Sequence, residues 1–173
     1  MKTIGIMTLI LLAASLVMAA ESTVNLDRCA VLNDPGDAGA PSKIAMHFVM
    51  LDEIQNREVI YSALSFTIPD LKLNRDANVE ISLYPILEDW SESDIKYDEI
   101  TDNLSIGSFT IKLGATNQFN IDIAPYVRQI IEDGRSNFGL IGVVEVLDDS
   151  NIQLPDNSDA QIMNSAEVKI VYK

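Results

Sequence analysis

The stretch Val79-Glu80-Ile81-Ser82-Leu83-Tyr84 alternates apolar and polar side chains along its length. A period of two is typical of a β-strand with one buried and one exposed face, so its aliphatic residues are predicted to point inward. The same alternation recurs in three further stretches: 60–68, 109–113 and 119–123. Four half-buried strands predict a sheet protein with a polar outer surface.

Two other stretches, 44–51 and 139–147, are apolar on nearly every residue, as expected of strands covered on both faces. A last strand is predicted at 168–172. Upstream, 24–32 is interpreted as a short strand at best, and the turn residues at 33–39 predict a loop. About eight short strands separated by turns, without alternating helices, favour an antiparallel β-sandwich.

One segment, 125–134, departs from the strand pattern. Pro125 stands where a helix begins, and Gly134 stands where one ends. Two apolar pairs spaced four residues apart share one side of this helix: Tyr126 with Ile130, and Val127 with Ile131. The sequence therefore predicts one short helix that covers an end of the sandwich.

The N-terminus has the pattern of a secretory signal peptide, with Lys2, an apolar run over 4–18, and small residues at Ala19 and Ala20. The predicted organisation is a signal peptide at 1–20, an N-terminal arm or loop at 21–43, and a β-sandwich domain at 44–173. An uncleaved anchor is the alternative, although a spanning helix needs about 20 apolar residues. The mature protein is predicted to be secreted, either extracellular or periplasmic.

The charge balance narrows the possible partners. The 173-residue chain carries 26 acidic and 12 basic residues, and its net charge is −14; without Lys2 it is −15. Nucleic-acid binding needs Lys and Arg residues in a cluster, and the sequence contains no such cluster. Anionic membranes and polysaccharides repel such a chain. Nucleic acids are therefore excluded as partners, and no membrane insertion is expected once the signal peptide is removed.

No catalytic constellation is recognisable, so the chain is predicted not to be an enzyme. His47 is the only histidine, and a mid-strand histidine is more often structural than catalytic. Acidic residues surround Trp90 and are interpreted as a solvated loop: Glu88, Asp89, Glu92, Asp94, Asp98 and Glu99. A pair of them acting on a glycosidic bond is the remaining enzymatic alternative. Cys29 is the only cysteine, which leaves either a partly buried thiol or an intermolecular disulfide.

Two acidic loops suit a structural Ca²⁺ ion, because hard oxygen ligands lie close together in turn-forming sequence. The candidate ligands are Asn33, Asp34, Asp37, Asp148, Asp149, Asp156 and Asp159. Neither loop has the EF-hand spacing. Calcium is therefore predicted only as a possible structural cofactor.

Exposed aromatic rings are the other candidate binding chemistry, because sugar rings stack on aromatic faces. Tyr84 is predicted to lie on the outward face of its strand, and Trp90 and Tyr97 follow a strand end. These three residues are the candidate ligand-binding set. For Trp90 the alternative is a core plug at the sandwich edge.

Six short motifs follow one another along the chain: Lys43–Phe48, Ser62–Phe66, Trp90–Tyr97, Asn120–Ile123, Asn137–Leu140 and Val168–Tyr172. In this order they resemble the DNRLRE domain, also described as disaggregatase-related or carbohydrate-binding module family 96, over about residues 43–173. Tyr97 stands where that family commonly has a second Trp, and its N-terminal strand is not recognisable in 21–42. The resemblance implies an extracellular, jelly-roll-like β-sandwich that is usually non-catalytic, with some members binding polysaccharide.

The sequence thus predicts a secreted, non-catalytic β-sandwich that binds polysaccharide or another cell-surface component. The alternative is a structural subunit of an extracellular matrix, sheath or filament. In that alternative, molecules associate through an N-terminal arm added to a neighbour's sheet edge, or through Cys29. A polysaccharide hydrolase or lyase is a third and weaker possibility.

Overall fold

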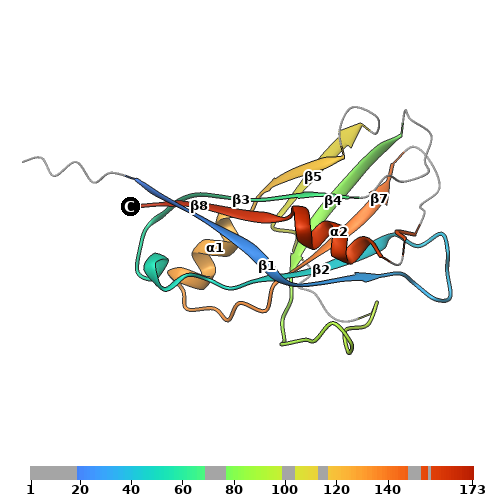
Figure 1. Ribbon diagram of the computed structural model, residues 1–173, viewed down its shortest axis with the longest axis horizontal. Helices are drawn as coiled ribbons and strands as arrows, with labels where there is room; N and C mark the ends of the chain where they lie inside the picture. The colour runs from blue at the N-terminus through green and yellow to red at the C-terminus, as the bar shows by residue number, and fades with distance from the viewer. Residues whose placement is uncertain (1–18, 69–76, 99–103, 113–116, 148–152, 156) are drawn as a thin grey trace, which may run out of the picture.

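The computed structural model describes residues 19–68, 77–98, 104–112, 117–147, 153–155 and 157–173 (Figure 1). The described chain forms strands and short helices in the order β1 (Ala20–Leu32), β2 (Ser42–Phe48), η1 (Asp52–Ile54), β3 (Val59–Thr67), β4 (Asn78–Pro85), β5 (Gly107–Lys112), β6 (Gln118–Asp122), α1 (Ala124–Ile131), β7 (Leu140–Val146), α2 (Ser158–Ser165) and β8 (Glu167–Tyr172). Most of the predicted signal peptide, residues 1–18, lies outside the described residues. No helix in the described part of the chain is long and apolar enough to cross a membrane.

The strands form two layers joined by β1, in the order β5-β4-β7-β2-β1-β8-β3-β6. We call β1-β8-β3-β6 sheet A and β5-β4-β7-β2-β1 sheet B. The first half of β1 pairs with β8 and its second half pairs with β2, with a register shift between Leu26 and Arg28. All pairings are antiparallel, so the predicted all-β antiparallel class is confirmed. The jelly-roll-like designation stays a prediction.

The main core lies between the inner faces of the two sheets. β4 shows how it forms, because Val79, Ile81 and Leu83 are fully buried while the residues between them are half-buried. Sheet A contributes Phe66 and Phe119, whose rings stack with centroids 5.6 Å apart. Each fully buried side chain of this size contributes about 1.5–3 kcal/mol. Every strand predicted downstream of residue 43 overlaps an observed one.

The N-terminal arm differs from its prediction. Residues 20–32 form the longest strand of the described chain, and that strand is hydrogen-bonded to neighbours in both sheets. Its inward positions include Val24 and Leu26, which are buried in the main core. The alternation is present in the sequence, but the polar side chain of Ser22 at an inward position obscured it. Pairing and burial therefore outweigh the weak β-propensity of this stretch. The loop predicted next does follow β1.

The helices also differ from the prediction, which expected one. The first, α1, begins with Pro125 near its N-terminus and buries Tyr126 and Val127 in the main core, as predicted. The second, α2, contacts β1 and β3 and contributes Ile162 to the same core. It was missed because it has a single buried apolar side chain and thus no apolar stripe.

A second apolar cluster lies on the outer face of sheet B. After β4 the chain crosses this face as an irregular stretch, residues 86–98, which we call the cover segment. Its apolar side chains pack against side chains of β1, β2 and β7 that point away from the main core. The resulting outer core comprises Ala30, Ala45, Ile86, Trp90, Ile95 and Ile141. The candidate functional site lies in this third layer.

Candidate functional site

A cavity of about 260 Å³ lies between the cover segment and sheet B. Its lining includes Trp90 and isoleucines, among them Ile141 of β7. It also includes three acidic residues, Glu88, Asp89 and Asp94. The site therefore combines an apolar surface with several hydrogen-bond acceptors, a combination that is usual in small-molecule pockets.

Trp90 is the central anchor of the cover segment. Its side chain is only 7% exposed, and its Nε1–H donates to the carbonyl oxygen of Phe138 at 2.7 Å. The guanidinium of Arg28 lies over the ring, 4.9 Å from the centroid. The indole thus has its polar atom satisfied and much of its surface covered, as a core residue requires.

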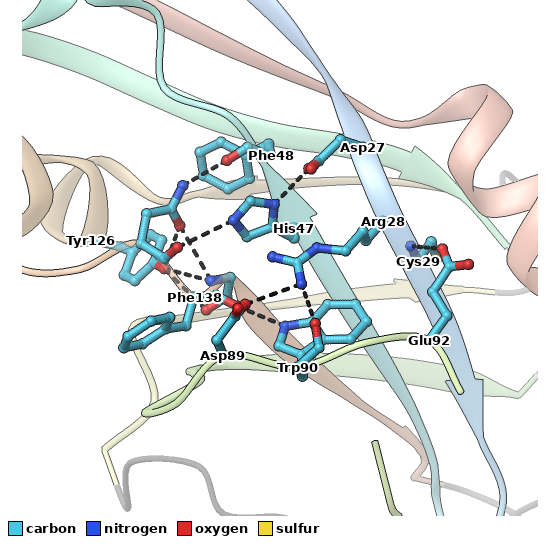
Figure 2. A network of polar contacts seen from close by, with 12 residues as sticks. Asp27, Arg28, Cys29, His47, Phe48, Asp89, Trp90, Glu92, Tyr126 and Phe138 are labelled. Carbon is cyan, nitrogen blue, oxygen red and sulfur yellow. Dashed lines mark hydrogen bonds and ion pairs between the residues drawn. The ribbon is translucent and has the colours of Figure 1, made fainter. Parts of the chain in front are cut away.

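Arg28 of β1 ties the cover segment to sheet B (Figure 2). It donates to the carbonyl oxygen of Trp90, and its Nη1 lies 3.1 Å from Oδ1 of Asp89. This hydrogen bond holds the pKa of the Asp89 carboxyl below its usual range. One of the three carboxylates at the cavity is therefore paired and stays ionised under mildly acidic conditions.

Two further contacts fix the cover segment. Glu92 accepts a hydrogen bond from the backbone N–H of Cys29 at 3.0 Å. Lys43 of β2 donates to the carbonyl oxygen of Tyr97 at 2.7 Å, and its ammonium lies 4.1 Å from the centroid of that ring. The Tyr97 hydroxyl donates to the carbonyl oxygen of Pro41 at 2.8 Å. Polar contacts along its length therefore hold a segment that has no regular secondary structure of its own.

The carbonyl that receives the Trp90 N–H belongs to a turn formed by Asn137, Phe138 and Gly139, which we call the 137–139 turn. Tyr126 donates from its hydroxyl to the carbonyl oxygen of Gly139 at 3.0 Å, and burial raises the pKa of this phenol to about 12. Gly139 has a φ of 95°, and a Cβ there would lie 2.2 Å from the Met46 carbonyl oxygen. Only glycine therefore fits this turn.

His47 of β2 lies beside the same turn (Figure 2). Its Nδ1 is 2.6 Å from Oδ1 of Asp27, and its Nε2 is 3.1 Å from the carbonyl oxygen of Asn137. Both ring nitrogens are therefore occupied by neighbours within the protein. This explains how a polar side chain is buried near the end of β2, between Met46 and Phe48.

The three predicted sugar-binding residues lie in three different environments. Trp90 lies in the outer core and lines the cavity, as the core-plug alternative proposed. Tyr84 is half-buried and pairs in register with Ile141, so it lies next to the cavity without lining it. Tyr97 is half-buried under Lys43 at another part of the cover segment. The three rings therefore do not form one stacking platform.

The predicted calcium ligands are largely used in other ways. Asn33 accepts a hydrogen bond from Ser42 and donates to Leu154. Asp34 and Asp37 each accept a backbone N–H two residues ahead, and Asp159 accepts the N–H of Ala160. Asp148, Asp149 and Asp156 lie outside the described residues. Among the described residues no three His, Cys, Asp or Glu side chains are grouped as metal ligands would be. Calcium stays a prediction.

Cys29 is buried, with 3% of its surface exposed, and this burial raises the pKa of its thiol to about 12. A thiol in this state is neither nucleophilic nor presented to a second molecule. The structure thus supports the interpretation of Cys29 as a small core residue.

Sequence reasoning missed the role of Arg28 and interpreted the acids around Trp90 only as a solvated loop. Arg28 is 61 residues from Asp89 along the chain, and no local pattern joins them. The one available signal was a lone tryptophan flanked by carboxylates, since such a residue needs both an apolar contact and an acceptor for its N–H.

The scan against family models finds no model that matches this chain, and the search of curated proteins finds no relative. The resemblance to the DNRLRE domain therefore stays a prediction.

Proposed function

We propose that this chain is a secreted, non-catalytic β-sandwich module that binds polysaccharide in the cavity under the cover segment. The observation that carries the proposal is the mixed lining of this cavity, which combines Trp90 and isoleucines with three acidic residues. A sugar ring has the matching chemistry, because its C–H face is apolar and its hydroxyls donate hydrogen bonds. Carboxylates accept such bonds strongly.

The charge of the site selects among saccharides. Glu88 and Asp94 are exposed, and Arg28 pairs with Asp89. The remaining negative charge, together with the acidic chain around it, disfavours anionic polymers. The ligand is therefore a neutral or amino-bearing saccharide, and its hydroxyl or ammonium groups meet the carboxylates of Glu88 and Asp94, the second of which also accepts a hydrogen bond from the Ser91 hydroxyl at 2.5 Å.

Two observations support a binding role over a catalytic one. Both nitrogens of His47 are engaged, so the only histidine in the chain has no free site for proton transfer to a substrate. The Cys29 thiol is buried and protonated. Release of reducing ends from a polysaccharide panel would contradict the non-catalytic part of the proposal.

Secretion is supported by the place where the sandwich begins. β1 starts at Ala20, the last residue of the predicted signal peptide, and Ala20 pairs in register with Tyr172 of β8. Removal of residues 1–20 therefore takes one residue from β1 and leaves the pairing of Glu21 to Asn25 with β8.

The experiment is a binding screen of the mature protein against neutral, amino-bearing and anionic polysaccharides, with and without Ca²⁺. Glu88→Gln and Asp94→Asn remove acceptor charge, and each is expected to weaken binding roughly tenfold, since a hydrogen bond to a charged group contributes about 1.5–3 kcal/mol. Asp133→Asn, an exposed acid beyond α1, is the control. Absence of binding to every polysaccharide would overturn the function, and equal binding by all variants would overturn the site.

The matrix or filament alternative has less support. Its two features were a free N-terminal arm and a reactive Cys29. In the structure β1 is part of both sheets, paired with β8 over its first half and with β2 over its second, so it is not a free arm, and Cys29 is buried. Assembly by another surface stays a prediction, and light scattering at high protein concentration, with and without Ca²⁺, tests it.

A further inference from the structure

The cavity under the cover segment has the volume of one sugar residue. It measures about 260 Å³, which is below the range of about 300–1,000 Å³ that is usual for drug-sized ligands. A cavity of about 150 Å³ binds one benzene molecule, so each ring carbon takes up about 25 Å³. By this measure the present cavity holds about ten non-hydrogen atoms, close to the size of one hexose residue and about half that of two.

The cavity is formed mainly by one loop. All of its lining residues except Ile141 of β7 belong to residues 86–95 of the cover segment. This stretch turns back on itself after Trp90, because the backbone N–H groups of Asp94 and Ile95 both donate to the carbonyl oxygen of Ser91 at 3.1 Å. The turn therefore brings Asp94 and Ile95 to the same cavity as Trp90, and the loop curls around the space instead of leaving a long groove.

The buried and the exposed lining residues differ in kind. The apolar ones, Ile86, Trp90, Ile95 and Ile141, are each at most 9% exposed. The three acidic ones are exposed, and all of them come from the cover segment. The cavity therefore opens to solvent beside the acidic residues. A sugar residue inside a chain needs two exits for its two linkages, whereas a terminal residue needs one, so this lining suits a terminal residue.

The aromatic residues give no support for a chain that lies along the surface. Such a chain would stack on exposed rings, but Trp90 is only 7% exposed, and the guanidinium of Arg28 lies over its ring (Figure 2). Tyr84 and Tyr97 are half-buried, and neither lines the cavity. The indole is therefore placed to contact a ligand that has entered the cavity.

We propose that the cavity binds the terminal residue of a saccharide chain, with the remainder of the chain outside it in solvent. This inference rests on the function proposed above, because it takes the ligand to be a saccharide. The apolar face of the terminal ring lies against Trp90 and the isoleucines. A terminal residue also has an additional hydroxyl that no linkage blocks, and this hydroxyl donates a hydrogen bond to the acidic residues at the opening.

Shortening a polymer multiplies its ends without changing the mass of sugar, and this separates the two ways of binding. Chitosan serves as the amino-bearing probe and a β-glucan as the neutral one, each intact and after partial hydrolysis. If the ends bind, a tenfold reduction in mean chain length should lower the mass concentration at half-saturation about tenfold. Borohydride reduction of the hydrolysate, which opens the reducing-end ring, then shows which end enters the cavity.

The outcomes separate this inference from the proposed function. Equal mass concentrations for the intact and the hydrolysed polymer would show binding within the chain, so the function would stand and the inference would be overturned. If no polysaccharide of the screen binds in either form, both are overturned.

Trp90 gives an independent measurement, because it is the only tryptophan of the chain and lines the cavity. Glucosamine and methyl glucoside, as single-residue probes, should change its fluorescence to the same final level as their oligosaccharides. Their dissociation constants should lie within about threefold of those of the oligosaccharides, because further residues remain in solvent. An affinity that keeps rising with each added residue would contradict binding of a terminal residue.

A pair of variants tests the location. Ile95→Trp places a larger side chain in the lining, and it should weaken binding of the hydrolysed polymer at least tenfold in calorimetry. Leu87→Trp is the matched control, because Leu87 is in the same segment, is 46% exposed and does not line the cavity. Circular dichroism checks that both variants fold. Equal binding by two folded variants would overturn the assignment, and the chain-length experiment on the unmodified protein decides the matter if Ile95→Trp does not fold.

Discussion

The main core and the outer core of this protein are built in different ways. The main core is made by strands whose alternating side chains meet between two sheets, and its largest members are fully buried. The outer core is made by an irregular segment laid over the back of one sheet, and it depends on polar contacts made by Arg28, Lys43 and the Trp90 N–H. Apolar burial between paired strands stabilises the first, whereas the second combines apolar burial with side-chain hydrogen bonds.

The largest effect is expected in the main core. Phe119→Ala removes a fully buried ring that contacts both Phe66 and Phe109, and it should lower the free energy of unfolding by about 3–5 kcal/mol. Urea denaturation followed by circular dichroism measures this. Phe109→Ala is the comparison, because its ring is 38% exposed, and it should cost less than half as much. Equal costs would show that the β5 side of the sandwich is as tightly packed as its centre.

A smaller loss is expected where the outer core meets the 137–139 turn. Trp90→Phe keeps an aromatic ring but removes the donor to the Phe138 carbonyl, which should cost about 2 kcal/mol, since that oxygen is left without its partner. Denaturation by circular dichroism again provides the measurement. Tyr84→Phe, an aromatic residue on the same face, should change stability by less than about 0.5 kcal/mol. If the two variants behave alike, the hydrogen bond does not hold the cover segment.

Arg28→Met should cost about 1 kcal/mol, because it removes a partly exposed cation over the Trp90 ring. It should also raise the pKa of the Asp89 carboxyl, which Arg28 holds down. A lowered pKa in the folded state gives stability that is present above the unfolded pKa and is lost as the pH falls through the folded one. NMR titration of Asp89 in the wild type and in Arg28→Met measures the shift. An unchanged Asp89 titration would contradict the ion pair.

The smallest effect has the opposite sign. Ser62 is fully buried in β3, and among the described residues its hydroxyl has no hydrogen-bond partner. Ser62→Ala should therefore be neutral or stabilise the protein by up to about 1 kcal/mol. Ser42→Ala is the contrast, because the Ser42 hydroxyl donates to Asn33 and accepts from Leu154 N–H. It should destabilise, and thermal unfolding of the pair gives the comparison.

The two cores also differ in what the sequence predicts of them. Alternation at 79–84 correctly predicted that Val79, Ile81 and Leu83 are buried, because successive side chains of a strand point to opposite faces. The turn residues at 33–39 and the Pro125 helix start were equally local signals. These patterns predicted the part of the main core that comes from the later strands and from α1, whereas the contributions of β1 and α2 were not predicted.

The outer core and the cavity were not predictable in this way. Arg28 meets Asp89 and Trp90, and His47 meets Asn137, across tens of residues of intervening chain. Such contacts arise from the pairing of sheet B, which brings β1, β2 and β7 side by side. Sequence reasoning named Trp90 and its neighbouring acids, but which of them are paired depends on the tertiary fold.

The double role of β1 has a consequence for folding kinetics. In sheet A the first strand is neighbour to the last one, because Ala20–Asn25 pairs with residues 167–172 of β8. The pairings of β8 with β1 and with β3 cannot form until β8 has been synthesised. Pairing between such distant segments is slow, on the order of milliseconds to seconds. The part of sheet A that contains β8 is therefore completed only after residues 167–172 have been synthesised.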